Sequence, residues 1–252
     1  MTVTDSLRRI AALTRHNTIL RLRDPGPFLS YLVMPMVVML ALQPVYRRAF
    51  PDGTIQIATG MLVIFSVLAL SIVGTATLTE RSWHTWDRLR STPVTITELL
   101  LGKMLPVYAV LVLQQSILLV YGITILGMRP SDTYWLPVVA IAVWGATLLA
   151  VGAALAAVVR SHGELSAITD IGALVLTTLG GAFVPTTTFP HWLQAVAPAS
   201  PGYWAMRMLQ AALRGDVPET LAPALVLLLV GGSAAVFACW RLSRDWGRAT
   251  MV

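Results

Sequence analysis

The chain has 252 residues, of which 56% are hydrophobic and only 12% are charged, and its formal net charge is +6. A soluble globular domain carries about 25% charged residues, so this composition excludes an ordinary soluble protein. The basic balance is typical of arginine at the cytoplasmic ends of membrane spans, and we do not expect nucleic-acid binding. Because Cys239 is the single cysteine, an intrachain disulfide and a metal site built from several cysteines are excluded.

Residues 1–26 carry five arginines and no apolar run of seven residues, so we do not expect a cleaved signal peptide there. Residues 3–23 are predicted to form an interfacial helix whose basic face meets lipid headgroups or a partner. Its apolar side on a helical projection consists of Leu7, Ile10, Ala11 and Leu22. A flexible basic tail is the alternative.

Six apolar stretches of roughly 20 residues follow, each long enough to cross a hydrocarbon core of ~30 Å as a helix. They occupy residues 27–46, 55–79, 101–127, 134–159, 165–184 and 219–241. Turn-forming sequences separate them, such as Pro51-Asp52-Gly53 between the first two stretches. We therefore predict one all-α membrane domain over residues 1–252, with six transmembrane helices.

The distribution of basic residues predicts the orientation of these spans. With the N-terminus inside, 13 of the 18 lysines and arginines fall on the inner side. The five on the outer side are Arg47, Arg48, Arg129, Arg207 and Arg214. Because basic residues favour the cytoplasmic side of a membrane, both termini are expected in the cytoplasm.

A charged and aromatic segment that ends in a proline, residues 80–93, lies between the second and third spans. As a helix it places Trp83, Trp86 and Arg90 along one stripe. Glu80 and Asp87 would then bind arginines of a partner, while the tryptophans lie at the membrane interface. We predict a short amphipathic docking helix on the cytoplasmic side; a structured loop with ordinary interfacial tryptophans is the alternative.

Motifs for catalysis and nucleotide binding are missing from the sequence. A phosphate-binding loop requires glycine, four residues and then Gly-Lys-Ser/Thr, but Gly102-Lys103 is followed by Met104, and Thr97 stands in place of the first glycine. No two histidines have the spacing of a zinc protease, and Gly-x-Ser-x-Gly is absent. We therefore expect no catalytic, metal or cofactor site in this chain.

The stretch 185–213 is apolar but interrupted by four prolines, so it is not expected to form a seventh straight span. Apolar, broken sequence between two spans favours short re-entrant helices packed within protein. Trp192, Tyr203 and Trp204 fit an outer interfacial belt. An external loop with aromatic anchors is the alternative.

Several of these motifs together resemble permeases of the type-2 ABC exporter family. The resemblance rests on Glu80-Arg81, on Thr85-Trp86-Asp87-Arg88-Leu89, on Pro93 and on Leu101-Gly102-Lys103. A second match runs from Gly181 through Pro185, Pro190-His191-Trp192, Pro198 and Tyr203, and it is similar to the family's extracellular re-entrant hairpin. Asp87 departs from the glutamate that is more usual in the family, but it keeps the charge.

The resemblance implies that the chain is the membrane half of a daunorubicin-resistance-like exporter in the bacterial plasma membrane. Two permeases, identical or related, would enclose a substrate path, and two ABC ATPase subunits would bind beneath them, with ATP and Mg on the ATPases. Their closure would push on segment 80–93 as a coupling helix. The residues expected to couple to the ATPase are Glu80, Arg81, Trp83, Trp86, Asp87, Arg88, Leu89 and Pro93.

Polar side chains inside predicted spans mark a candidate substrate path, because they are costly in lipid. The outliers are Gln114, Gln115 and Asp170. For the glutamines, hydrogen bonding between helices is the alternative. In the resembled family the second and fifth spans line the path. That resemblance adds the residues Met61, Phe65, Thr169, Ala173 and Thr177.

The predicted function is that of a permease subunit moving a small amphiphilic drug or antibiotic out of the cell. Export of polysaccharide or lipid is the alternative within the class, because an apolar path suits drugs and lipid tails equally. A membrane scaffold subunit without transport and an intramembrane enzyme are the alternatives from other classes.

Overall fold

The computed structural model describes residues 3–23, 26–71, 96–159 and 161–248, and this part of the chain is helical throughout, with no strand. The bundle-forming helices are α2 (Gly26–Ala49), α3 (Gly53–Leu68), α6 (Ile96–Thr124), α7 (Trp135–Val158), α8 (His162–Leu179) and α11 (Val217–Arg248). The amino-terminal helix is α1 (Val3–Arg23). Between α8 and α11 lie η1 (Thr186–Thr188), α9 (His191–Val196), η2 (Ala197–Ala199) and α10 (Pro201–Arg214).

Each of the six stretches predicted as spans therefore overlaps one helix, although α3 ends at Leu68, before the predicted end of its stretch at residue 79. Four of the described helices are long and apolar enough to cross a membrane: Phe28–Ala49, Met104–Thr124, Trp135–Val158 and Val217–Arg241. α3 is apolar but shorter. α8 has 18 residues and carries two acids, Glu164 and Asp170. A multi-pass helical membrane domain is the architecture that these helices support.

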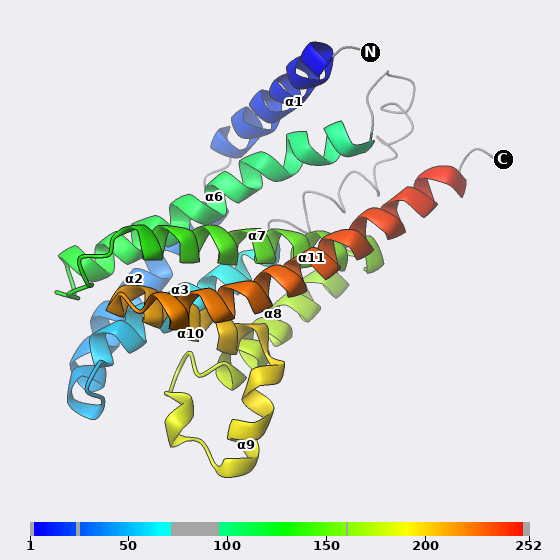
Figure 1. The fold of residues 1–252 in the computed structure, drawn as a ribbon. Helices are drawn as coiled ribbons and strands as arrows, with labels where there is room; N and C mark the ends of the chain where they lie inside the picture. The colour runs from blue at the N-terminus through cyan, green and yellow to red at the C-terminus, as the bar shows by residue number, and fades with distance from the viewer. Residues whose placement is uncertain (1–2, 24–25, 72–95, 160, 249–252) are drawn as a thin grey trace.

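The bundle is antiparallel, and its turns gather at two ends (Figure 1). The α2–α3, α6–α7 and α10–α11 turns share one end, where the Ser131 amide donates to the Leu213 carbonyl at 2.8 Å. The start of α6 and the end of α11 lie at the other end, together with α1 (Figure 1). Among the described residues, α1, the start of α6 and the end of α11, all predicted to face the cytoplasm, thus share one end of the bundle.

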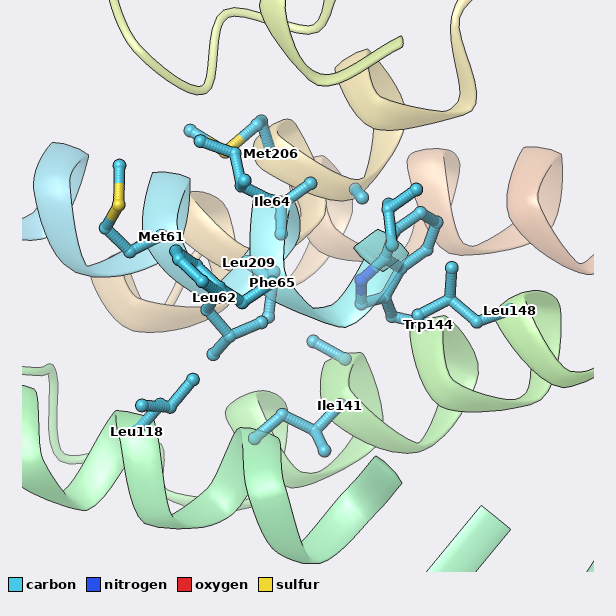
Figure 2. Packing of buried hydrophobic residues seen from close by; sticks show 14 of the residues in the cluster. Met61, Leu62, Ile64, Phe65, Leu118, Ile141, Trp144, Leu148, Met206 and Leu209 are labelled. Carbon is cyan, nitrogen blue, oxygen red and sulfur yellow. The ribbon is translucent and has the colours of Figure 1, made fainter. Parts of the chain in front are cut away.

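α3 is the central helix of the packed core. Its side chains are buried on all faces from Gln56 to Val67. Figure 2 shows Leu62 and Phe65 of α3 among side chains of α6, α7 and α10, such as Leu118, Ile141 and Leu209. The indole of Trp144 also reaches α3, where it donates a 2.8 Å hydrogen bond to the hydroxyl of Ser66. This core fixes α3 between α10 and the α6–α7 pair.

Local sequence sets the ends of α8 and α10. Ser161 caps α8 by accepting a hydrogen bond from the Glu164 amide, three residues on, and the acid favours the helix start. Ser200 caps α10 in the same way, and Pro201 occupies its first position. α10 ends at Gly215, whose φ of 77° is a conformation that glycine adopts without strain.

The segment 185–213 is not one straight helix, as its prolines predict. Pro185 and Pro190 stand just before η1 and α9, and Pro201 begins α10. α9 projects from the bundle, while α10 returns and packs against α3, α7, α8 and α11 (Figure 1). The segment therefore contributes one buried helix to the core.

α1 is a helix over the predicted residues 3–23, and it packs along α6. The face that meets α6 differs from the predicted apolar side. Leu13 lies over Gly102, and the Asn17 amide donates to the Gly102 carbonyl at 3.5 Å, whereas Leu7 is 60% exposed. The absence of a side chain at Gly102 lets the two helices approach closely, and this contact decides which face of α1 is covered.

Candidate functional site

The predicted ATPase-coupling segment, residues 80–93, lies outside the described residues. Glu80, Arg81, Trp83, Trp86, Asp87, Arg88, Leu89 and Pro93 all belong to it. The described chain reaches Ser71 before it and resumes at Ile96, the first residue of α6. The role of these eight residues stays a prediction.

The five predicted path residues from α3 and α8 are buried in this structure. Met61 and Phe65 lie on α3, and they are 2% and 7% exposed. Thr169, Ala173 and Thr177 lie on the face of α8 that is buried, and α8 packs against α3. The threonine hydroxyls donate to carbonyls of their own helix, at Leu165 and Ala173. In this conformation all five residues are therefore buried within the packed helices.

The polar outliers of the predicted spans do not come together in one site. The Gln114 amide is buried and donates to the Tyr31 carbonyl of α2 at 3.0 Å, which is a bond between helices. Gln115 is fully buried next to Gly145 of α7, and neither atom of its amide has a hydrogen-bond partner among the described residues. Such an amide carries a desolvation cost without compensation.

Asp170 lies on the exposed face of α8 in this single chain. Its neighbours on that face are apolar, with Ile171 66% and Leu174 59% exposed. An ionised carboxylate in such an apolar surface is costly in lipid unless water or a partner chain covers it. Asp170 is therefore at the surface, whereas Gln114 and Gln115 are interior.

A polar stripe on α10, which we call the α10 clasp, joins three neighbouring elements. It consists of Arg207, Gln210 and Arg214, which follow one another at helical spacing along the exposed edge of α10. Arg207 pairs with Glu219 at the start of α11. Arg214 pairs with Asp52 of the α2–α3 turn at 3.1 Å. The hydrogen bond to Glu219 raises the pKa of the Arg207 guanidinium, so this group stays charged.

Gln210 connects the α10 clasp to the interior of α3. Its amide nitrogen donates to the Gln56 Oε1 at 2.7 Å, and the Gln56 amide nitrogen donates to the Gly181 carbonyl at 2.7 Å. Gly181 has a φ of 82°, which allows the tight turn that follows α8. Tyr46 of α2 donates to the next part of the same turn, at the Phe183 carbonyl. Hydrogen bonds thus join α2 and α3 directly to this turn, and α10 through Gln56.

Beside the α10 clasp lies a cavity of about 330 Å³. Its walls are the α2–α3 turn, the Gly180–Thr187 region and one edge of α10. A smaller cavity of about 110 Å³ lies on the other side of the arginines, near Asp216 and Glu219. None of the predicted path residues lines either cavity.

Sequence reasoning missed this site, although it counted Arg207 and Arg214 among the outer basic residues. The signal was the spacing of Arg207, Gln210 and Arg214 within the broken segment 185–213. The partners Asp52 and Gln56 are more than 150 residues away in sequence, so no local pattern connects them to α10.

Comparison with known proteins shows that the chain is similar to membrane permeases. The family described as ABC-2 type transporter matches residues 8–213. The chain is 22% identical over 206 residues to the linearmycin resistance permease protein LnrN of Bacillus subtilis, covering 82% of this chain and 53% of LnrN. It is 26% identical over 227 residues to the daunorubicin resistance ABC transporter permease protein DrrB1 of Streptomyces coeruleorubidus, covering 85% and 77%.

A further relative is the inner membrane transport permease YhhJ of Escherichia coli. It is 25% identical over 187 residues, which cover 72% of this chain and 50% of YhhJ. The chain therefore spans about half the length of LnrN and of YhhJ.

Proposed function

This chain belongs to the ABC-2 type transporter family, and on that basis we propose that it is the membrane permease subunit of an ATP-driven exporter. The family resemblance inferred from segment 80–93 and the 181–203 motifs is thereby confirmed. The observation that carries the proposal is the family match over residues 8–213, which includes both motif regions. The cargo we propose is a small amphiphilic compound of the drug or antibiotic kind.

The names of two relatives support this cargo class, because LnrN and DrrB1 are both resistance permeases. The interior also fits it physically. The buried faces of α3 and α8 combine apolar side chains with threonines whose hydroxyls are bonded within their own helix. Such faces suit an apolar or amphiphilic molecule when they separate. Met61, Phe65 and Ala173 are the residues that we propose line this path.

ATP is hydrolysed, in this proposal, by two separate ABC ATPase subunits, which also hold the magnesium. Segment 80–93 contacts them as a coupling helix from the end of the bundle that carries the start of α6. A second permease, identical or related, completes the path at the exposed face of α8 around Asp170. The chain then lies in a bacterial plasma membrane with six spans, both termini in the cytoplasm and segment 185–213 re-entering from the outside.

The test is affinity purification of the tagged chain from its native membranes in mild detergent, followed by mass spectrometry of the bound proteins. We expect an ABC ATPase to co-purify with the wild type and to be lost from a Trp86→Ala, Arg88→Ala double variant. The matched control removes the same residue types at the opposite end of α6, Arg129→Ala and Trp135→Ala, both of them exposed positions. This control is expected to retain the ATPase.

Absence of any ATPase from the wild-type preparation would contradict the exporter proposal and favour a membrane scaffold. Loss of the ATPase from both double variants would contradict the assignment of coupling to segment 80–93. Transport of radiolabelled candidate drugs, compared with glycan and lipid precursors, then distinguishes drug export from polysaccharide or lipid export.

A further inference from the structure

The cavity beside the α10 clasp has a lining that no part of the proposed transport path uses. We propose that this cavity is a binding site for a neutral, hydroxyl-rich group about the size of one sugar ring. The volume of about 330 Å³ lies near the lower end of the ~300–1,000 Å³ typical of small-molecule sites. A single ring fits within this volume.

Charge on the cavity walls argues against an ionic ligand. Arg207 and Arg214 both line the cavity, but each guanidinium is already paired with a carboxylate, that of Glu219 or Asp52. An anion entering the cavity meets the Asp52 carboxylate on the same wall, and a cation meets the two guanidinium groups. A neutral ligand keeps both ion pairs intact.

The amides in the wall offer donors and acceptors together. Gln56 is 5% exposed. Its side-chain amide donates one N–H to the Gly181 carbonyl and accepts one hydrogen bond from Gln210, so one N–H and one oxygen lone pair remain unused by the described residues. The carbonyl oxygen of the Gln210 amide accepts no hydrogen bond from the described residues. A hydroxyl group has one donor and two acceptor lone pairs, and its proton can rotate, so it can meet either kind of group in such a wall. Thr186 and Thr187, which also carry hydroxyl groups, are further residues of the lining.

Aromatic side chains provide the apolar part of the lining. Tyr203 lines the cavity, and the Arg207 guanidinium lies 5.8 Å from the centre of its ring. Phe50 lines the side formed by the α2–α3 turn. Apolar or aromatic surface with a few placed polar groups is the usual composition of a small-molecule site. A ring that carries hydroxyls at its edge and C–H groups on its face satisfies both parts of this lining.

The test measures protection of a cysteine at the rim in the purified full-length chain, held in lipid nanodiscs without glycosidic detergent. Thr187→Cys is introduced together with Cys239→Ser, because Cys239 is exposed and would react as well. The rate of maleimide modification is followed with methyl glucopyranoside and with myo-inositol as probes, and with sodium phosphate and choline as charged comparisons. The matched control is Thr188→Cys, which is exposed but does not line the cavity.

We expect the neutral probes to slow modification of the Thr187→Cys protein at least threefold and saturably, with no change for Thr188→Cys. Gln56→Leu should abolish this protection. If that variant does not fold, Gln210→Leu, at a half-buried position of the cavity wall, serves the same purpose. Lack of protection, equal protection of both cysteines, or stronger protection by phosphate or choline would overturn the proposal. Because binding needs no ATPase, its failure leaves the exporter proposal standing, and the reverse also holds.

Discussion

The contact between the end of α8 and the start of α10 depends on Gly202, and replacing this glycine by alanine tests the packing of the fold. A Cβ at Gly202 would lie 2.6 Å from the Leu176 carbonyl oxygen, against 3.4 Å for an ordinary contact. The backbones must therefore separate by 3.4 − 2.6 = 0.8 Å. The Ser200 hydroxyl, which donates to the same carbonyl at 2.6 Å, would be displaced with them.

The expected cost follows from the kind of atom that is contacted. Overpacking a well-packed site typically costs ~1–3 kcal/mol, and because the Leu176 carbonyl belongs to the backbone and cannot rotate away, we take about 3 kcal/mol. Alanine in a helix recovers up to about 1 kcal/mol relative to glycine. The free energy of unfolding should therefore fall by roughly 2 kcal/mol, which lowers Tm by about 4–8 °C for a domain of this size.

The assay is thermal unfolding of the purified protein in nanodiscs, followed by tryptophan fluorescence. Gly232→Ala is the control, because a Cβ at this exposed position of α11 meets nothing within 4 Å. The control should leave Tm unchanged or raise it slightly, through helix propensity alone. A Gly202→Ala protein that melts at or above the wild-type temperature would refute the reasoning that α8 and α10 meet through backbone at this point.

The remaining predictions concern polar side chains. Gln114→Leu should lower the free energy of unfolding by ~0.6–2 kcal/mol, because it removes the hydrogen bond to the Tyr31 carbonyl. Gln115→Leu should be neutral or stabilise the protein by about 1 kcal/mol, because the Gln115 amide makes no hydrogen bond within the described part of the chain that could be lost. Equal effects of the two variants in chemical or thermal unfolding would contradict the structure. Asp52→Asn should change the free energy of unfolding by less than about 1 kcal/mol, because the Asp52–Arg214 ion pair is half exposed. A larger loss in unfolding experiments would mean that this pair is more buried than the structure shows. Asp170→Asn should alter export or its pH response at unchanged expression, measured as drug efflux across a pH series; wild-type efflux at every pH would refute a role for the carboxylate.

The places of the helices could be predicted from sequence, but not all of their ends: α3 ends at Leu68, before the predicted residue 79, and α11 continues to Arg248, past the predicted residue 241. Apolar stretches of about 20 residues predicted α2, α6, α7 and α11, because only a helix satisfies backbone hydrogen bonds across an apolar layer. The prolines between residues 185 and 201 predicted the break before α10 for an equally local reason. The family was also readable from short motifs, and the match over residues 8–213 confirms it.

The candidate site could be predicted only in part. Sequence alone selected Gln114, Gln115 and Asp170 as outliers, but it could not tell that the first is bonded, the second unpaired and the third exposed. It also did not predict that Met61 and Phe65 are buried within the packed helices. The coupling residues of segment 80–93 rest on the motif and the family match, because they lie outside the described residues.

Sequence by itself determined what is set by neighbours along the chain: which stretches are helical, where prolines break them, and which family the motifs belong to. Tertiary structure decided which helix is central and which faces meet. In an apolar helix every face looks alike, so hydrophobicity does not separate the buried side of α3 from a lipid-facing side. The α10 clasp shows the same limit, since Gln210 and Gln56 are joined only because the chain folds back over 154 residues to bring α10 onto α3.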